Sequence, residues 1–151
     1  MLKKYRKHIL LWLIVILYTL WIFHNSMQTG NTSAHLSQGI SYQIYTKLTF
    51  LHGLPFQTFH TFIRKLAHFS EYALLGILVS LVSKQTLPTR YQHISILVWM
   101  ILIPFMDEGI QYFTPGRSCE LRDCFIDMSG YAFGWFLQST IHHFIQRQKR
   151  G

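Results

Sequence analysis

The sequence predicts an all-α membrane protein, a four-helix transmembrane bundle with one further amphipathic helix on the extracytoplasmic side between the first and second spans. Three observations support this prediction. Half of the 151 residues are hydrophobic and 13% are charged, which is about half the charged share of a typical soluble domain. The apolar residues gather into four long runs, and five of the six acidic residues lie between Asp107 and Asp127. We therefore expect one polytopic membrane domain over residues 1–151.

Each of the four apolar runs is close to the length of about 17 to 25 residues that crosses the hydrocarbon core. Basic residues precede the first run, and no small-x-small cleavage site follows it. We therefore interpret it as a retained helix and not as a cleaved signal peptide. Pro88 lies between the second and third runs, and the Pro115-Gly116 pair predicts a tight turn before the fourth. The predicted spans are residues 9–26, 66–83, 93–113 and 124–145.

Residues 34–51 have a different pattern, in which apolar residues recur three or four positions apart and polar residues occupy the other faces. The apolar set is Leu36, Ile40, Ile44, Leu48 and Leu51. This spacing predicts an amphipathic helix that lies in the membrane interface or over the other helices. A plain connecting helix without affinity for the membrane is the alternative. Gly53 and Pro55 are expected to end the helix.

The distribution of Lys and Arg predicts the orientation, because these residues are enriched in short cytoplasmic segments. With the N-terminus inside, nine of the fourteen fall on the cytoplasmic side and five on the outer side. Both termini are therefore expected in the cytoplasm. The outer set is Lys47, Arg64, Lys65, Arg117 and Arg122.

In this topology the acidic residues of three antiparallel spans meet at one level. At a rise of about 1.5 Å per residue, all of them fall within roughly 10 Å of the outer boundary. Carboxylates in such a setting need cationic partners or bound protons. The available cations at that level are Arg64, Lys65, His68, Arg117 and Arg122. We expect a polar pocket that opens outward.

Ionisable residues within membrane spans are costly and normally face a protein interior or an aqueous cavity, so each is a functional-site hypothesis. Carboxylates and a histidine within hydrogen-bond reach of a ligand could exchange protons with it, and arginine could bind a phosphate or carboxylate. The candidate catalytic residues are Glu108, Glu71, His68 and Asp107. The candidate binding residues are Arg64, Tyr72, Gln111, Arg117, Asp123 and Asp127.

Other interpretations of the same residues remain open at this point. Glu71 could form a structural salt bridge with Arg64 or His68, and the charges could together fix the register of the helices. A divalent metal could bind at His68, Glu71, Asp107 and Asp123, but no dedicated ligand spacing such as HExxH is present, so no metal or cofactor is expected. Nucleic-acid binding is not expected either, since the chain has no basic stripe and no zinc-finger or RNP-like motif.

The two cysteines, Cys119 and Cys124, are too few for a disulfide framework or a cysteine-rich zinc site. They could close one small loop on an oxidising exterior. Alternatively, both are unpaired and Cys124 is a small apolar residue at the start of a helix.

Three ordered motifs resemble the VanZ-like family of small bacterial membrane proteins. They read RKLAHFSEYALLG over residues 64–76, DEGIQYFTPGR over residues 107–117 and DCFIDMSGYAFG over residues 123–134. The ordered set is specific, although each motif alone is weak. Asp127 stands where family members often have asparagine, which adds a negative charge at that position.

The resemblance implies an integral protein of the bacterial cytoplasmic membrane that acts in the cell envelope. It implies, for some members, lowered susceptibility to teicoplanin-type lipoglycopeptides, and it supplies no reaction mechanism. The expected partners are the lipid bilayer and a lipid-linked envelope precursor or lipoglycopeptide, which the outer pocket would bind or modify. The alternative is a non-catalytic structural or partner-binding membrane module whose buried charges fix helix packing.

Overall fold

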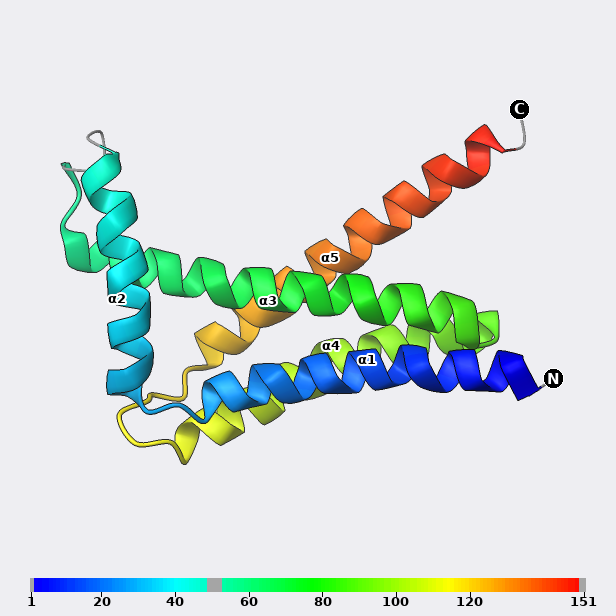
Figure 1. Ribbon diagram of the computed structural model, residues 1–151, viewed down its shortest axis with the longest axis horizontal. Helices are drawn as coiled ribbons and strands as arrows, with labels where there is room; N and C mark the ends of the chain where they lie inside the picture. The colour runs from blue at the N-terminus through cyan, green and yellow to red at the C-terminus, as the bar shows by residue number, and fades with distance from the viewer. Residues whose placement is uncertain (1, 49–52, 150–151) are drawn as a thin grey trace.

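The computed structural model describes residues 2–48 and 53–149, and over these ranges it consists of five helices and their connections (Figure 1). The all-α prediction is thereby confirmed. The helices are α1 (Leu2–Ser26), α2 (Gly30–Lys47), α3 (Phe56–Thr86), α4 (Thr89–Tyr112) and α5 (Leu121–Gln148).

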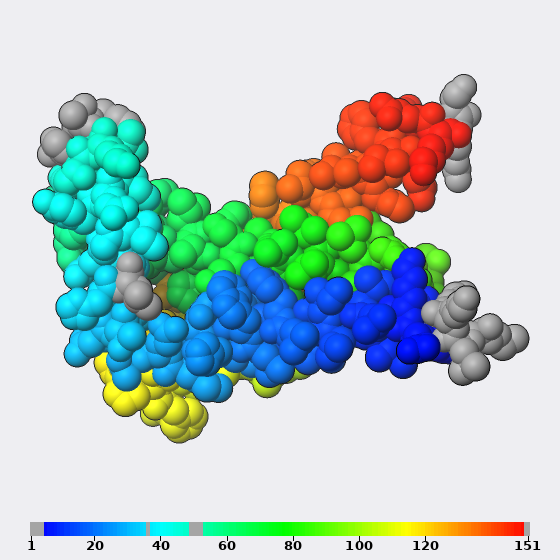
Figure 2. Space-filling view, in the orientation of Figure 1, coloured from blue at the N-terminus to red at the C-terminus, as the bar shows by residue number. Residues whose placement is uncertain are grey.

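Helices α1, α3 and α4 lie side by side along the long axis of the molecule, with α3 antiparallel to the other two (Figure 1). Helix α2 stands across one end of this group, at the C-terminal end of α1 and the N-terminal end of α3. Helix α5 starts near that same end and crosses α3. Its C-terminal part then stands away from the rest of the molecule (Figure 2), and residues 141–149 are all exposed.

Within the described ranges, three helices are long and apolar enough to cross a membrane, namely Tyr5–Ser26, Phe56–Thr86 and Thr89–Tyr112. They correspond to the first three predicted spans. Helix α5 covers the fourth predicted span but does not join this group, because polar residues such as Gln138, His142 and His143 interrupt its apolar character. A four-span bundle therefore remains a prediction.

The helix bounds differ from the predicted ones mainly at α2 and α3. Helix α3 begins at Phe56, ten residues before the predicted second span, with Pro55 as its N-cap. The sequence pattern missed this extension because the first turns carry polar and basic residues. Helix α2 begins early, where the Thr29 hydroxyl accepts a hydrogen bond from the Thr32 N–H at 3.4 Å. Leu51, at the predicted end, lies outside the described residues.

Two members of the predicted apolar stripe of α2, Ile40 and Leu48, lie on the surface, and the side chain of Leu36 lies outside what the structure describes. Ile40 is 60% exposed and Leu48 is also exposed, whereas Ser41 is completely buried. Ser37 contacts α3, with its hydroxyl oxygen 2.8 Å from the Nε2 atom of His60. The helix itself is thus observed, and its insertion into the membrane interface remains a prediction.

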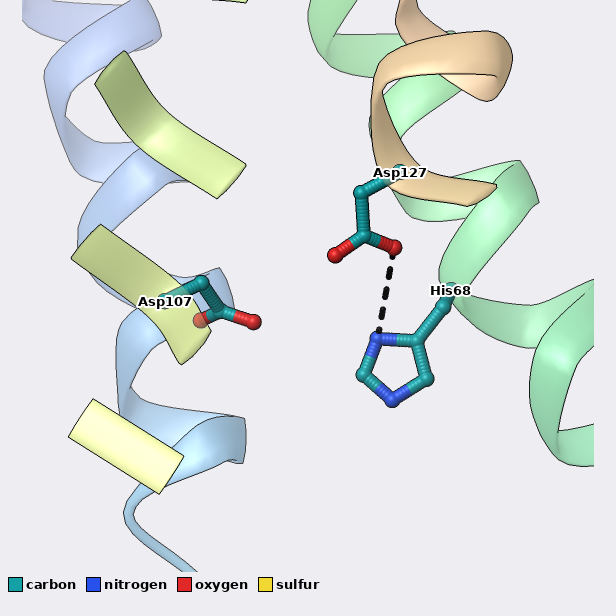
Figure 3. A group of neighbouring side chains, drawn as sticks. All are labelled: His68, Asp107 and Asp127. Atoms are coloured by element: carbon teal, nitrogen blue, oxygen red, sulfur yellow. Dashed lines mark ion pairs between the residues drawn. The ribbon is translucent and has the colours of Figure 1, made fainter. Parts of the chain in front are cut away.

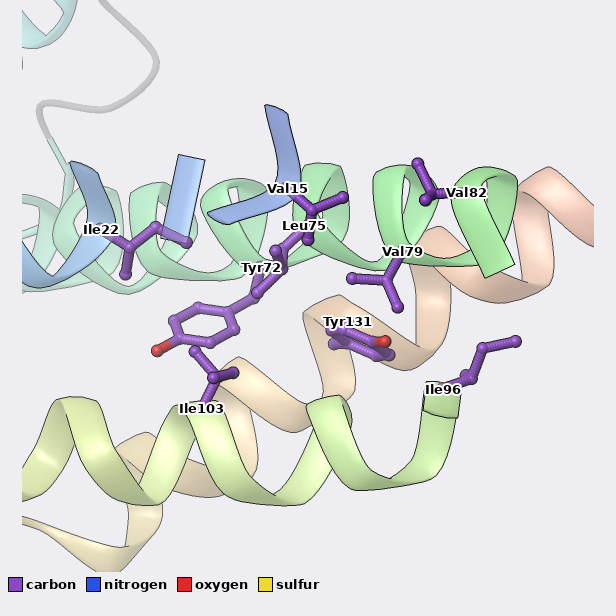
Figure 4. Packing of buried hydrophobic residues seen from close by; sticks show 9 residues of the cluster. All are labelled: Val15, Ile22, Tyr72, Leu75, Val79, Val82, Ile96, Ile103 and Tyr131. Carbon is purple, nitrogen blue, oxygen red and sulfur yellow. The ribbon is translucent and has the colours of Figure 1, made fainter. Parts of the chain in front are cut away.

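The apolar core lies between α1, α3, α4 and α5 (Figure 4). Tyr72 and Tyr131 are its largest members, and both are completely buried. Lipid tails are as apolar as these side chains, so burial in a membrane stabilises the fold through close packing and not through removal of water. The cluster comprises Val15, Ile22, Tyr72, Leu75, Val79, Val82, Ile96, Ile103 and Tyr131.

The closest helix pair is α3 with α5, and glycine makes its approach possible. A Cβ atom on Gly134 would lie 1.9 Å from the carbonyl oxygen of Ala73, and one on Gly130 would lie 2.3 Å from that of Phe69. From the other side, a Cβ on Gly76 would lie 2.2 Å from the carbonyl oxygen of Tyr131. Gly130 and Gly134 thus let the two helices pack closely, as small residues do between membrane helices.

Gly134→Ala is predicted to destabilise the fold by about 1–3 kcal/mol, because the obstructing atom is backbone and cannot rotate away. Gly109→Ala in α4 is the matched control, since no atom lies within 4 Å of its added Cβ. Thermal unfolding of both purified variants in detergent, followed by size-exclusion chromatography, measures the difference. Equal melting temperatures for the two variants would show that the α3–α5 contact can open without cost.

A second close approach joins the α1–α2 turn to the turn before α5. The Gly30 N–H donates a hydrogen bond to the Pro115 carbonyl at 3.0 Å, and the Thr114 hydroxyl donates to the Ser26 carbonyl at 3.3 Å. Gly116 has a φ of +74°, a conformation that glycine adopts without strain. A Cβ on Gly30 would lie 1.8 Å from the Gly116 carbonyl oxygen.

Gly30→Ala is therefore predicted to separate the two turns and to lower stability by roughly 1–3 kcal/mol. Gly39→Ala in the same helix is the control, since its Cβ would have no neighbour within 4 Å. The helix propensity of alanine should leave this control as stable as the wild type or slightly more so. Limited proteolysis of membranes that contain each variant compares them, and increased cleavage near the turns is expected in Gly30→Ala alone. Equal cleavage of the two variants would contradict the prediction.

Candidate functional site

A cavity of about 340 Å³ opens between the C-terminal end of α1, helix α2 and the N-terminal half of α3. A second one, of about 150 Å³, lies towards the loop before α5. Arg64, His68 and Arg117 line both, so the two spaces share a wall. The larger cavity is lined by Asn25, Ser26, Gln28, Ser33, Ser37, Ile40, Ile63, Arg64, Ala67, His68, Glu71 and Arg117.

Arg117 is fixed in this wall by hydrogen bonds to the α1–α2 turn. Its Nη2 atom donates to the Asn25 carbonyl at 3.0 Å, and its Nε atom donates to the Gln28 carbonyl at 3.1 Å. The Asn25 carbonyl belongs to the last turn of α1, where the helix dipole is negative, and Gln28 follows in the turn to α2. Burial, and then the neighbouring Arg64, lower the pKa of Arg117 from its ordinary value. Arginine nevertheless remains charged in proteins, so a fixed cation faces the cavity.

Arg64 adds a second cation to the same wall. Within the described part of the chain, its side chain makes no hydrogen bond and no ion pair. The facing carboxylate is Glu71, whose Oε1 atom accepts a hydrogen bond of 3.5 Å from the Asn25 amide. The structural salt bridge from Glu71 to Arg64 or His68 is therefore absent among the described residues. Arg64 is left available to a ligand.

Next to the cavity wall, three helices bring His68, Asp107 and Asp127 together (Figure 3). Each side chain offers one ligand atom, and these atoms all lie within 4.8 Å of one another. The Nδ1 atom of His68 is 3.8 Å from the Oδ1 atom of Asp127. Both aspartates are completely buried. Ionisable residues from three helices therefore do meet, but only two of the five acids that the sequence placed at this level, Asp107 and Asp127, belong to the cluster.

The remaining acidic residues are held apart from this cluster. Glu108 is 2% exposed, and its Oε2 atom accepts a hydrogen bond of 2.9 Å from the Glu120 N–H. This contact closes the loop before α5. Asp123 forms an ion pair with Lys65. The metal set proposed from the sequence, with Glu71 and Asp123, is therefore not the one that the fold assembles.

The predicted binding residues separate into three places. Arg64 and Arg117 line both cavities, and Gln111 and Asp123 line the smaller one. Asp127 belongs to the buried cluster. Tyr72 packs in the apolar core.

The hydroxyl of Tyr72 is buried, and within the described ranges it has no hydrogen-bond partner. The two cysteines are both free, with Cys119 exposed and Cys124 buried. The alternative without a disulfide is therefore the one observed.

Sequence reasoning missed the contribution of the α1–α2 segment to the larger cavity. Asn25 and Gln28 follow the first span, and Ser33 and Ser37 lie one helical turn apart on α2. The spacing of the two serines, with Ile40 three residues later, was the available signal for a shared face. The predicted apolar stripe of this helix contains Ile40 but neither serine, so the prediction did not place the serines at a site.

Comparison with known proteins identifies a family. The model of the VanZ/LLP1 family matches residues 9–142, which is most of the chain. No curated protein and no solved structure shows significant similarity. The matched range includes all three motifs and every residue of both cavities. The chain therefore belongs to the VanZ/LLP1 family.

Proposed function

We propose that this protein is a four-span membrane protein of the bacterial cell envelope that binds the anionic headgroup of an amphiphile at its outer side, and so lowers susceptibility to teicoplanin-type lipoglycopeptides. The amphiphile is a lipid-linked envelope precursor or the lipoglycopeptide itself. Both termini lie in the cytoplasm in this proposal. The larger cavity is the observation that carries it.

The chemistry of the cavity wall supports an amphiphile. Ile40, Ile63 and Ala67 contribute apolar surface to the wall. Arg64 and Arg117 contribute two cations to the same wall. Arginine binds phosphate and carboxylate through paired N–H groups. Because Arg64 has no partner among the described residues, a bound anion would not need to break an existing ion pair.

The other polar groups of the wall suit the uncharged part of a headgroup. Ser33, Ser37 and Gln28 carry hydroxyl and amide groups, and Glu71 can accept hydrogen bonds from hydroxyl or ammonium groups. A cavity of about 340 Å³ is within the range that holds a small ligand or one group of a larger one. The acyl chains of such an amphiphile would remain in the surrounding bilayer.

Arg64→Gln is predicted to remove protection, because it deletes the unpaired cation of the cavity. The measurement is growth inhibition by teicoplanin and by vancomycin in a susceptible host that expresses each variant at equal membrane levels. The wild type should protect selectively against teicoplanin, and Arg64→Gln should be as sensitive as the host with an empty vector. Arg122→Gln is the control, since it removes the same charge from an exposed residue outside both cavities.

Protection by Arg64→Gln equal to that of the wild type would contradict binding at this cavity. Loss of protection in both Arg64→Gln and Arg122→Gln would show that protection depends on overall surface charge and not on the cavity. Absence of protection in the wild type would contradict the link to lipoglycopeptides, and extraction of bound lipid from the purified protein would then test envelope-lipid binding separately.

The Lys65–Asp123 ion pair favours a second candidate, a structural module whose charges fix helix packing. This pair joins α3 to α5 beside the smaller cavity. If the charges serve only packing, Lys65→Asp and Asp123→Lys should each lower membrane abundance, and the double exchange should restore it. Because the pair is partly exposed, we expect effects of about 1 kcal/mol or less. Restored abundance without restored protection would reject a purely structural role.

A further inference from the structure

We propose that His68, Asp107 and Asp127 form a binding site for a divalent transition-metal cation. Each ligand comes from a different helix, namely α3, α4 and α5 (Figure 3). The three side chains point into one space, and their ligand atoms lie within 4.8 Å of one another. The site goes beyond the proposed headgroup binding and does not depend on it.

This inference rests on the missing hydrogen bonds of the proposed ligand atoms. Both oxygens of Asp127, one oxygen of Asp107 and the Nδ1 atom of His68 are buried without a hydrogen-bond partner within residues 2–48 and 53–149. Both aspartates are 0% exposed. Buried polar atoms are otherwise nearly always paired, and each orphaned atom carries a desolvation cost. A cation in the shared space would satisfy all three side chains at once.

Among the described residues, no lysine or arginine already fills this role. In the described part of the structure, neither Asp107 nor Asp127 has a lysine or arginine nitrogen within 4.0 Å. Lys65 forms an ion pair with Asp123. The Arg117 guanidinium donates hydrogen bonds to carbonyls of the α1–α2 turn. One divalent cation would balance the charges of the two carboxylates.

The donor set indicates which metals fit. One imidazole nitrogen and two carboxylate oxygens suit Zn²⁺ or Mn²⁺, whereas Mg²⁺ and Ca²⁺ prefer sites made of oxygen alone. Donor atoms at about 2.0–2.2 Å from zinc lie roughly 3.3 Å apart in a tetrahedral site. The present separation of 3.8 Å between His68 and Asp127 is close to that value, so side-chain rotation could complete the site, with water as a fourth ligand.

A second layer of contacts orients one of the ligands. The Gln111 amide donates a hydrogen bond of 3.0 Å to the Oδ2 atom of Asp107, and the Oδ1 atom has no hydrogen-bond partner among the described residues. Gln111 in turn accepts a hydrogen bond of 3.4 Å from Arg117. Such outer contacts are typical of metal sites, where they fix the direction of carboxylate ligands. Because His68 lines both cavities, a metal ion can reach the cluster through either of them.

Elemental analysis of the full-length protein tests the site. The protein is purified in detergent, its affinity tag is removed, and it is stripped with EDTA. It is then equilibrated with Zn²⁺ or Mn²⁺ and freed of unbound metal. The wild type should retain about one equivalent of one of these metals. Asp127→Asn should lose it, whereas Asp123→Asn, one helical turn away and outside the cluster, should keep it.

Two outcomes would overturn the proposal. The first is a folded wild type, monodisperse on size-exclusion chromatography, that retains neither metal. The second is an Asp127→Asn variant that retains as much metal as the wild type, which would place the metal at other histidines. Arg64→Gln should keep the metal even where it loses protection, which separates this test from that of the proposed function.

A spectroscopic measurement covers the case in which Asp127→Asn does not fold. Co²⁺ bound to the wild type should give visible absorption bands that depend on its nitrogen and oxygen ligands, and these bands should disappear in His68→Gln and in Asp107→Asn. Bands that are unchanged in both variants would reject these residues as ligands.

Discussion

The fold depends on how two buried carboxylates are accommodated where three helices converge. Asp107 and Asp127 lie in the interior of the molecule, next to the apolar core and away from water. An isolated ionised carboxylate in such a place is very costly, so the surrounding structure must supply positive charge or protons. The helices around the pair place the imidazole of His68 beside it, with the Nδ1 atom 3.8 Å from the Oδ1 atom of Asp127. The cavities, the Arg117 contacts and the loop before α5 all lie around this centre.

Much of the fold could be predicted from the sequence because apolar length is a local property. The runs that became α1, α3 and α4 are visible without knowledge of their neighbours, as is the level at which the acidic residues meet. Helix α5 was harder, because its apolar residues are mixed with polar ones over most of its length. Its position depends on contacts of Gly130 and Gly134 with the α3 backbone, and the sequence shows only that such contacts are allowed.

The candidate site was predicted only in outline, since side-chain pairing is decided by geometry. Five acids and their possible cations share a level in the predicted topology, and many pairings are consistent with that level. The structure selects Lys65 with Asp123 and leaves Arg64 without a partner among the described residues. It also uses Glu108 to accept the Glu120 N–H, a contact between a helix and a loop that no periodicity indicates. Residues of α1 and α2 line the cavity because the Gly30 N–H donates a hydrogen bond to the Pro115 carbonyl, which fixes the α1–α2 turn against the loop before α5. The sequence does not reveal this contact.

The hydrogen-bonded series from Arg117 through Gln111 to Asp107 has a thermodynamic consequence. Its first member faces the cavity, and its last belongs to the buried cluster. A ligand that draws the guanidinium towards itself changes what Gln111 can donate to the carboxylate, and a change at the carboxylate acts back on the guanidinium. Coupling between two sites is reciprocal, so occupants of the two proposed sites would alter each other's binding constants by the same factor. The wall of the cavities and the buried cluster are therefore joined through one glutamine side chain.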